Sequence, residues 1–546
     1  MKNAKNNMFS SIIIPMLLIG GIVAVSVVGW NLGFRAPPDA TQNFKYTETN
    51  FGSYLAMRHA IWVDDFDSVS KFSDALSDVE IKSVQSDLAL GRFISGRFDD
   101  SAKIFENDKS APARVAYASY LIRHDDWAQV YKLTQKDDSM IMSPLRIWSA
   151  VAVHKESEAL KFIDAAPADE SWKLFMRGMV YAETDRPDKA KALFDKVPLD
   201  FFNLNDYLYM LSFYKTRGFD QAAEDLKSDF AASPGGAYVG DYYETEIDQT
   251  GVKNALVFSL VQNISHSPAL LYTNVGILMT RLAESVQTPA NDAVNYYLGL
   301  SFYNSGSPKY GEYFEKVDSK SPYYAFVVLK NAEKAGNFEK MRGQLEAELN
   351  KNPTFLPALN KLVAINLQKG RENDALNVVN KALKQPGLSN YTQADLLKTR
   401  TLVYLRKNDL KKAQDDIIHA GDLAPNNPEV LTMTARVWAA RKENLDMAYD
   451  YAMGVIEKFP GEVSPWDALA MVVWAREGVK PAAEVLERVG RVADENSALF
   501  EHLGDARAAQ GDNKGAAAAY QKALKLSGDG LSSEPELQNK IKKLKF

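Results

Sequence analysis

The chain begins with a long uncharged stretch. No residue between Lys5 and Arg35 is charged, and the segment from Ser11 to Trp30 is 20 residues of almost unbroken apolar character. About 20 apolar residues, at about 1.5 Å of helical rise each, cross the roughly 30 Å hydrocarbon core of a bilayer. The pattern therefore predicts a transmembrane helix over residues 8–30, with Trp30 at the membrane interface.

The charges that flank this stretch predict its direction. Lys2, Lys5 and the terminal amine precede it, whereas Arg35 is soon followed by Asp39. Positive charge is retained on the cytoplasmic side of a membrane. Residues 1–7 are therefore predicted to be cytoplasmic, and everything after the helix is predicted to be exported.

A cleaved signal peptide is the alternative for the same stretch. Residues 24–26 form a small-x-small triplet of the kind that precedes signal cleavage. The sequence nevertheless stays apolar as far as Trp30, which favours an uncleaved anchor. Residues 31–50 are polar and include Pro37 and Pro38, so they are predicted to form an extended linker.

The body of the chain repeats with a period of about 34 residues, most clearly near the C-terminus. Gly504 and Ala516 have counterparts in Ala470 and Ala482, and a large Tyr520 follows in the same unit. Small residues at these places predict two helices that cross closely, because a larger Cβ substituent would hold them apart. Aromatic residues between them would fill the space between successive helices.

Turn residues separate these helices at regular places. Gly370 and Gly511 stand where the first helix of a unit is expected to end, since glycine adopts the positive φ of a helix C-terminus. Pro353, Pro425 and Pro460 stand where the second helix should stop, since proline removes a helical N–H. The pattern is that of a helix–turn–helix repeat.

This pattern resembles the tetratricopeptide repeat (TPR). The resemblance is strongest over residues 322–530, about six units, and weaker over 51–234. Residues 235–321 depart from the pattern and are predicted to be an irregular or divergent helical region. Residues 531–546 are predicted to form a C-terminal capping helix that begins near Ser533. The resemblance implies an all-α fold, a right-handed superhelical solenoid with a concave groove, preceded by the single N-terminal transmembrane helix.

Composition narrows the possible chemistry. The 546 residues carry 64 basic and 70 acidic side chains, and 46% of them are hydrophobic, as in folded proteins. A net charge of −6 argues against a nucleic-acid partner, since such proteins usually have a basic excess. The absence of cysteine excludes disulfides and thiolate metal sites, and the six histidines lie in separate segments. No metal or cofactor is predicted.

No catalytic motif is convincing. The sequence contains no H-E-x-x-H, no phosphate-binding loop and no G-x-S-x-G elbow. Ser68 and Lys71 match S-x-x-K, but the companion motifs of that family are missing. The acidic segment from Asp241 to Asp248 lacks the ligand order of a calcium loop, so a solvated loop is the better interpretation. No catalytic residue is predicted, and the chain is not expected to be an enzyme.

The resemblance also indicates a binding surface. Tetratricopeptide arrays usually present their first helices along the groove, and a mixture of arginine, tryptophan and acidic side chains would suit an extended peptide with some positive charge. A generic solvated groove explains the same charges equally well. The groove positions that carry over are Asp395, Lys398, Arg436, Asp467, Met471, Trp474, Glu501 and Asp505.

These observations predict a non-enzymatic scaffold that binds protein or peptide segments in its groove. It resembles bacterial TPR proteins that are anchored in the inner membrane by one helix, with the body in the periplasm, and that recruit partners for envelope assembly, secretion or quality control. Two alternatives remain open at this point. One is an envelope hydrolase whose site is assembled from remote residues, and the other is a soluble periplasmic binding module released by signal cleavage.

Overall fold

The computed structural model describes residues 50–62, 65–76, 82–198, 202–232, 251–267, 269–270, 273–286, 291–304, 307–334, 337–493, 496–526 and 533–544. The expected cytoplasmic segment 1–7, the transmembrane helix 8–30, almost all of the linker 31–50 and the acidic segment 241–248 lie outside these residues. Within the ranges that are described, no helix is both long enough and apolar enough to cross a membrane.

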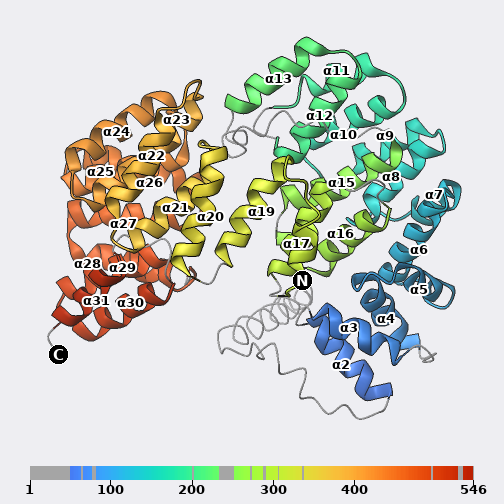
Figure 1. Ribbon diagram of the computed structural model, residues 1–546, viewed down its shortest axis with the longest axis horizontal. Coiled ribbons are helices and arrows are strands. Elements are labelled where there is room, and N and C mark those ends of the chain that lie inside the picture. The colour runs from blue at the N-terminus through green and yellow to red at the C-terminus, as the bar shows by residue number, and fades with distance from the viewer. Residues whose placement is uncertain are drawn as a thin grey trace, which may run out of the picture. The chain divides into compact units, whose positions relative to one another are not determined.

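The chain divides into two compact units, residues 1–120 and 121–546. In the first unit, Gly91 lies close to Met57 and Val69, which join three helices in one small core. The described helices of this unit are α2 (Asn50–Trp62), α3 (Phe66–Asp74), α4 (Lys82–Ile94), α5 (Phe98–Lys103), the 3-10 helix η1 (Ile104–Glu106) and most of α6 (Ala111–Arg123) (Figure 1).

The second unit begins with helices that alternate along the chain, so that most neighbours in sequence pack as antiparallel pairs. Its first part contains α7 (Trp127–Thr134), α8 (Met142–Ala152), α9 (Glu156–Ala165), α10 (Glu170–Glu183), α11 (Pro187–Phe194), α12 (Leu204–Thr216), α13 (Asp220–Ala232), α15 (Val252–His266), α16 (Asn274–Val286), α17 (Asp292–Asn304) and α18 (Tyr310–Phe314).

The described part of the chain from residue 322 to 526 forms six helix pairs, and we call the first helix of each pair A and the second B. The pairs are α19 (Pro322–Glu333) with α20 (Phe338–Lys351), α21 (Leu356–Gln368) with α22 (Glu372–Leu383), α23 (Asn390–Arg406) with α24 (Leu410–Leu423), α25 (Pro428–Arg441) with α26 (Leu445–Lys458), α27 (Val463–Glu477) with α28 (Val479–Gly490), and α29 (Ser497–Ala509) with α30 (Asn513–Leu526). The all-α repeat predicted for this region is confirmed. A last helix, α31 (Glu534–Lys543), follows.

The residues that end these helices act as the sequence predicts. Gly370 has a φ of +68° and Gly511 a φ of +83°, directly after the A helices α21 and α29. The B helices α20, α24 and α26 each end two residues before a proline, at Lys351, Leu423 and Lys458. Glycine and proline therefore end these five helices, whereas Asn408 and Lys442 adopt the positive φ after α23 and α25.

In three helix pairs, two of them before residue 322, a glycine on the first helix lies against an aromatic ring on the second, and we call these helices A and B as well. A Cβ atom on Gly504 would lie 2.5 Å from the ring of Tyr520, and one on Gly178 would lie 2.5 Å from the ring of Phe194. Gly299 of α17 makes the same contact with Phe314 of α18. The stretch 235–321, predicted to be irregular or divergent helical, thus includes this helix pair, whose second helix is only five residues long.

Helix α15 does not begin another pair of this kind. It packs against α8, α10 and α12, the A helices of three earlier pairs. The indole N–H of Trp148 donates a buried hydrogen bond of 2.8 Å to the Ser259 hydroxyl, and the Phe258 ring lies 4.7 Å from that of Tyr209. The A-helix face of this part of the chain is therefore covered by the chain's own helix.

The close A–B crossing generates a stability prediction. Gly504→Ala should lower the free energy of unfolding by about 1–3 kcal/mol, because the new methyl group overlaps the Tyr520 ring. Gly454→Ala, in the middle of α26 with open space around it, should instead raise it by about 0.4–1 kcal/mol. Urea unfolding followed by circular dichroism measures both. Equal effects of the two substitutions would contradict the steric explanation.

Candidate functional site

The A helices α21, α23, α25, α27 and α29 contact one another in order. We call the surface along their shared side the C-terminal groove. The predicted groove residues lie on four of these helices: Asp395 and Lys398 on α23, Arg436 on α25, Asp467, Met471 and Trp474 on α27, and Glu501 and Asp505 on α29.

The first polar cluster in the groove joins three A helices. Lys398 of α23 forms ion pairs with Asp395 on its own helix and with Glu429 on α25. Asp395 is buried and also accepts a hydrogen bond of 3.2 Å from the Asn360 side chain on α21. Lys398 is itself only 13% exposed. Two predicted groove residues are therefore engaged within the array.

A second cluster centres on Asp467, whose side chain is 1% exposed. One carboxylate oxygen accepts from the Arg436 guanidinium at 2.8 Å, and the other lies 2.6 Å from His502 Nδ1. Burial raises the pKa of Asp467, but the positive charges of His502 and Arg436 outweigh it and hold that pKa below its ordinary value. Burial lowers the pKa of His502, and the Asp467 carboxylate outweighs it, so that pKa lies above its ordinary value. The cluster links α25, α27 and α29.

The third cluster contains the last two predicted residues and a residue of α31. Lys540 Nζ lies 2.8 Å from Glu501 Oε1 and 2.8 Å from Asp505 Oδ1, and Tyr520 donates a hydrogen bond of 2.7 Å to Asp505. Burial lowers the pKa of Lys540, but the two carboxylates outweigh it and raise that pKa above its ordinary value. Lys540 of the predicted capping helix therefore places a positive charge beside the buried Glu501 carboxylate.

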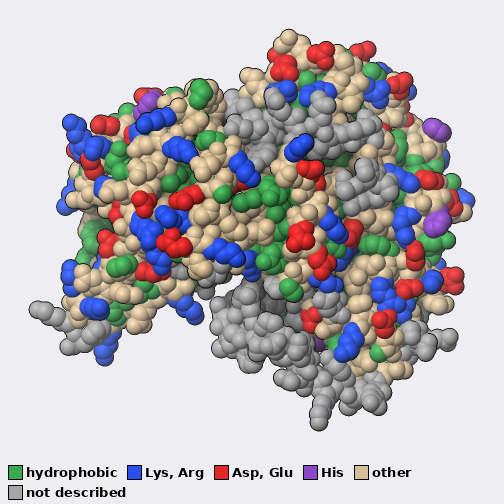
Figure 2. All heavy atoms as spheres, viewed as in Figure 1, with side chains coloured by type: hydrophobic (Ala, Val, Ile, Leu, Met, Phe, Trp, Pro, Cys, Tyr) green, Lys and Arg blue, Asp and Glu red, His purple; other side chains and the backbone are tan. Residues whose placement is uncertain are grey.

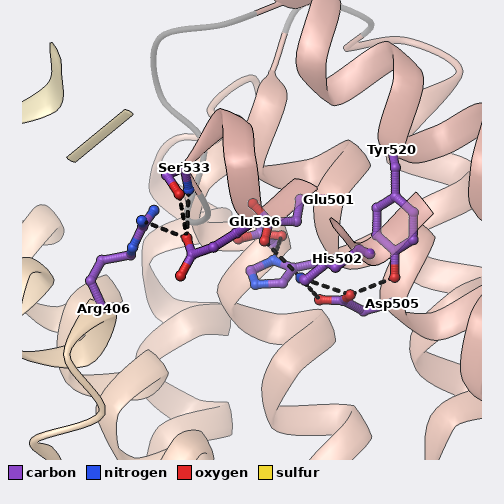
Figure 3. Close-up of polar contacts among 9 residues, drawn as sticks. Arg406, Glu501, His502, Asp505, Tyr520, Ser533 and Glu536 are labelled. Carbon is purple, nitrogen blue, oxygen red and sulfur yellow. Dashed lines mark hydrogen bonds and ion pairs between the residues drawn. The ribbon is translucent and has the colours of Figure 1, made fainter. Parts of the chain in front are cut away.

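Helix α31 also contacts helices far earlier in the chain. Glu534 pairs with Lys369 at the end of α21 at 2.8 Å, and Glu536 pairs with Arg406 at the end of α23 at 2.9 Å. Ser533 begins the helix with a capping box, in which Glu536 accepts from the Ser533 backbone N–H. Figure 3 shows Arg406 approaching Glu536 from one side, while Ser533 contacts the same carboxylate.

A cavity of about 270 Å³ lies between α31 and the A helices. Its walls include two arginines, Arg406 and Arg436, and the carboxylate of Glu536. Arg406 Nη1 and Arg436 Nε are buried and have no hydrogen-bond partner among the described residues. The apolar part of the wall is formed by Leu402, Leu405, Leu410, Ala440 and Met471.

Trp474 is the predicted groove residue that stands apart. Its half-buried side chain packs into the cores of the last two units and does not line the cavity. Met471, one turn earlier, does line it. The repeat spacing predicts both residues as groove positions on one helix, and in the structure Met471, not Trp474, lines the cavity.

Four features of these contacts were not predicted from the sequence: the side chains of Lys369, Arg406 and His502, and the position of α31 along the groove. His502 directly follows the predicted residue Glu501, and that adjacency was the one available signal. Its partner Asp467 lies 35 residues away on another unit, so the pairing appears only after the helices stack.

The surface of the C-terminal array carries intermingled charges. Figure 2 shows Lys and Arg side chains interspersed with Asp and Glu side chains over this part of the molecule, with no extended patch of one sign on the visible face. In the portion of the chain that the structure describes, no group of three or more His, Asp and Glu side chains could hold a metal ion.

The paired helices, their period and the A–B glycine contact show an all-α helical repeat fold, and its pattern resembles the tetratricopeptide repeat. No family model and no curated protein matches it. Among solved structures it is similar to Cut9–Hcn1 of the APC/C hetero-tetramer, with 12% identity, 91% of this chain and 96% of that one covered and a TM-score of 0.36. Yeast Tom70 has 14% identity, coverage of 90% and 94% and a TM-score of 0.29.

A tetratricopeptide repeat protein from Parabacteroides merdae also matches, with 15% identity, 54% of this chain and 98% of that chain covered and a TM-score of 0.30. At such identities and TM-scores the similarity supports no inference about partners or activity.

The Asp467–His502 pair makes stability depend on pH. Because the pKa of His502 is raised in the folded state, its contribution is fully present below about pH 6.5, the ordinary value, and is lost as pH rises through the folded pKa. The stability advantage of the natural chain over His502→Gln should therefore be larger at pH 6 than at pH 9, as measured by urea unfolding. An advantage that is constant with pH would contradict this.

Proposed function

We propose that the protein is a non-enzymatic scaffold that binds a segment of a partner protein in the C-terminal groove. The observation that carries the proposal is that the groove already holds a helix, α31, through side chains on α21, α23 and α29. A surface that accepts one short amphipathic helix by charge and apolar contact can accept another of the same chemistry.

The cavity supports this function because it offers depth in the middle of the groove. Interface anchors are side chains that fill pockets, and arginines with unused N–H groups provide directed donors beside the apolar wall. Met471 and Ala440 lie on the open part of that wall, so both are suitable positions for probing.

We further propose that residues 8–30 anchor the chain in an inner membrane with its body in the periplasm. The length and apolar character of this segment and the lysines before it support the proposal. An anchor would confine the groove near the membrane and raise the effective concentration of partners there, for envelope assembly, secretion or quality control.

A photoreactive amino acid at position 471 tests the binding function. Irradiation in cells should link the full chain to a reproducible partner identified by mass spectrometry. Ala440→Glu should reduce the yield at least about tenfold, because the new side chain fills the cavity from an exposed position without removing a core contact.

Two controls make the result specific. Met447 lies on B helix α26 and is 49% exposed, so a photoreactive residue there reports proteins that collide with the other side of the array. Met447→Glu is the matched charge substitution for Ala440→Glu and should leave the yield from position 471 unchanged. Equal yields from positions 471 and 447 would rule out the groove as the binding site.

A further inference from the structure

Helix α31 makes contacts that covering the last unit does not require. Leu537 is buried among residues of α29 and α30, which is enough to close the apolar end of a repeat array. The two acidic residues of the first turn instead pair with partners 165 and 130 residues earlier in the sequence. These pairs place the start of α31 across the groove.

The two ion pairs at the start of α31 involve partly exposed carboxylates, whereas Ser533 and Leu537 of the same segment are buried. Glu534 is 36% exposed and Glu536 is 54% exposed, and ion pairs at such exposure are largely screened by water. The helix has ten residues, and helices of this length are only marginally stable in isolation. Segments with few buried contacts open locally without global unfolding.

Two largely buried charges of the array would each lose an ion-pair partner if α31 left the groove. With α31 in place, Arg406 is 5% exposed and Glu501 is 2% exposed. Arg406 would lose Glu536 and keep a longer ion pair of 3.6 Å with Glu372, while its Nη1 group in the cavity wall has no hydrogen-bond partner among the described residues. Glu501 would lose Lys540. Removing one partner of a largely buried charge is costly, so these two side chains favour an occupant with matching charges.

We propose that α31 is a displaceable internal occupant of the C-terminal groove. The partner segment is then a short helix with the same order of charges. It begins with two acidic residues that take the places of Glu534 and Glu536 against Lys369 and Arg406. A lysine or arginine about one turn later takes the place of Lys540 against Glu501. This inference rests on the proposed scaffold function and specifies its ligand.

A labelled peptide in trans tests the proposal with the full chain. The probe is a fluorescent synthetic peptide of residues 531–546. The natural chain should bind it weakly, because its own α31 competes at high effective concentration. The double variant Glu534→Lys and Glu536→Lys, which leaves the groove residues intact, should bind the peptide at least about tenfold more tightly in fluorescence anisotropy.

A charge exchange establishes where the peptide binds. In the double-variant background, Lys369→Glu should weaken binding of the natural peptide, and a peptide with Glu534→Lys should restore it. Lys369 suits this exchange because it is 35% exposed and its described ion pair is with Glu534 alone. The matched control is Glu457→Lys with Glu484→Lys, which makes the same change in net charge at exposed positions on α26 and α28.

The outcomes separate this inference from the scaffold function. Equal peptide affinity of the natural chain and the double variant, or no binding by either, means that α31 is a fixed cap and overturns the inference. Crosslinking of a partner from position 471 that is unaffected by the double variant also overturns it, while the scaffold function stands. A crosslinking yield that rises in the double variant supports both. Tight binding of the peptide to the double variant, with no partner crosslinked in cells, supports α31 as a displaceable occupant of the groove and contradicts the scaffold function.

Discussion

The close crossing of helix A and helix B is the contact on which the fold depends. Gly178, Gly299 and Gly504 each leave room for one aromatic ring of the following helix, in pairs that lie far apart along the chain. A single pair cannot bury its outer apolar faces, so each pair becomes stable only against its neighbours. The period of the sequence, the placement of the prolines and the stacking of the A helices all follow from repeating this one contact.

Once the pairs stack, the A helices bring polar side chains from different units together. Asp395, Asp467 and Glu501 are buried carboxylates, and each has a cationic or amide partner on another helix. Removing one partner from such a pair is more damaging than never having formed it, since a buried charge is left behind. On the groove side, ion pairs and hydrogen bonds between A helices thus fix how neighbouring units align. Between helix A and helix B of one unit, close steric packing fixes the alignment.

The two parts of the second unit use the same kind of surface differently. The A helices α8, α10 and α12 are covered by α15 through buried rings and a buried Trp148–Ser259 hydrogen bond. Helix α31 contacts α21 and α23 through ion pairs of the partly exposed Glu534 and Glu536, and it contacts α29 through Lys540, which pairs with the buried Glu501, and through Leu537. Helix α15 is thus part of the core of its region, whereas the start of α31 is attached mainly by ion pairs that are partly exposed to water.

The sequence alone predicts the structural features that depend on residues close to one another along the chain. The six pairs over 322–530, their terminating glycines and prolines and the existence of α31 all rest on local spacing, and the structure has them where the pattern predicts. The pairing of Asp467 with His502, the position of Lys540 and the role of Trp474 depend on how distant units stack. The periodicity of the sequence predicts which residues share one face of a helix. It does not predict which side chains on two facing helices come into contact.

Helix α31 also has a mechanical consequence. A repeat array can bend and twist along its length, because small rotations at each interface between units add up along the stack. A helix that joins α21 and α23 to α29 closes a loop around the intervening units, so their rotations are no longer independent. The array should be stiff while this tie is in place and compliant once it is released. Binding or release of a helix in the groove would then change the elasticity of the whole stack from α21 to α29.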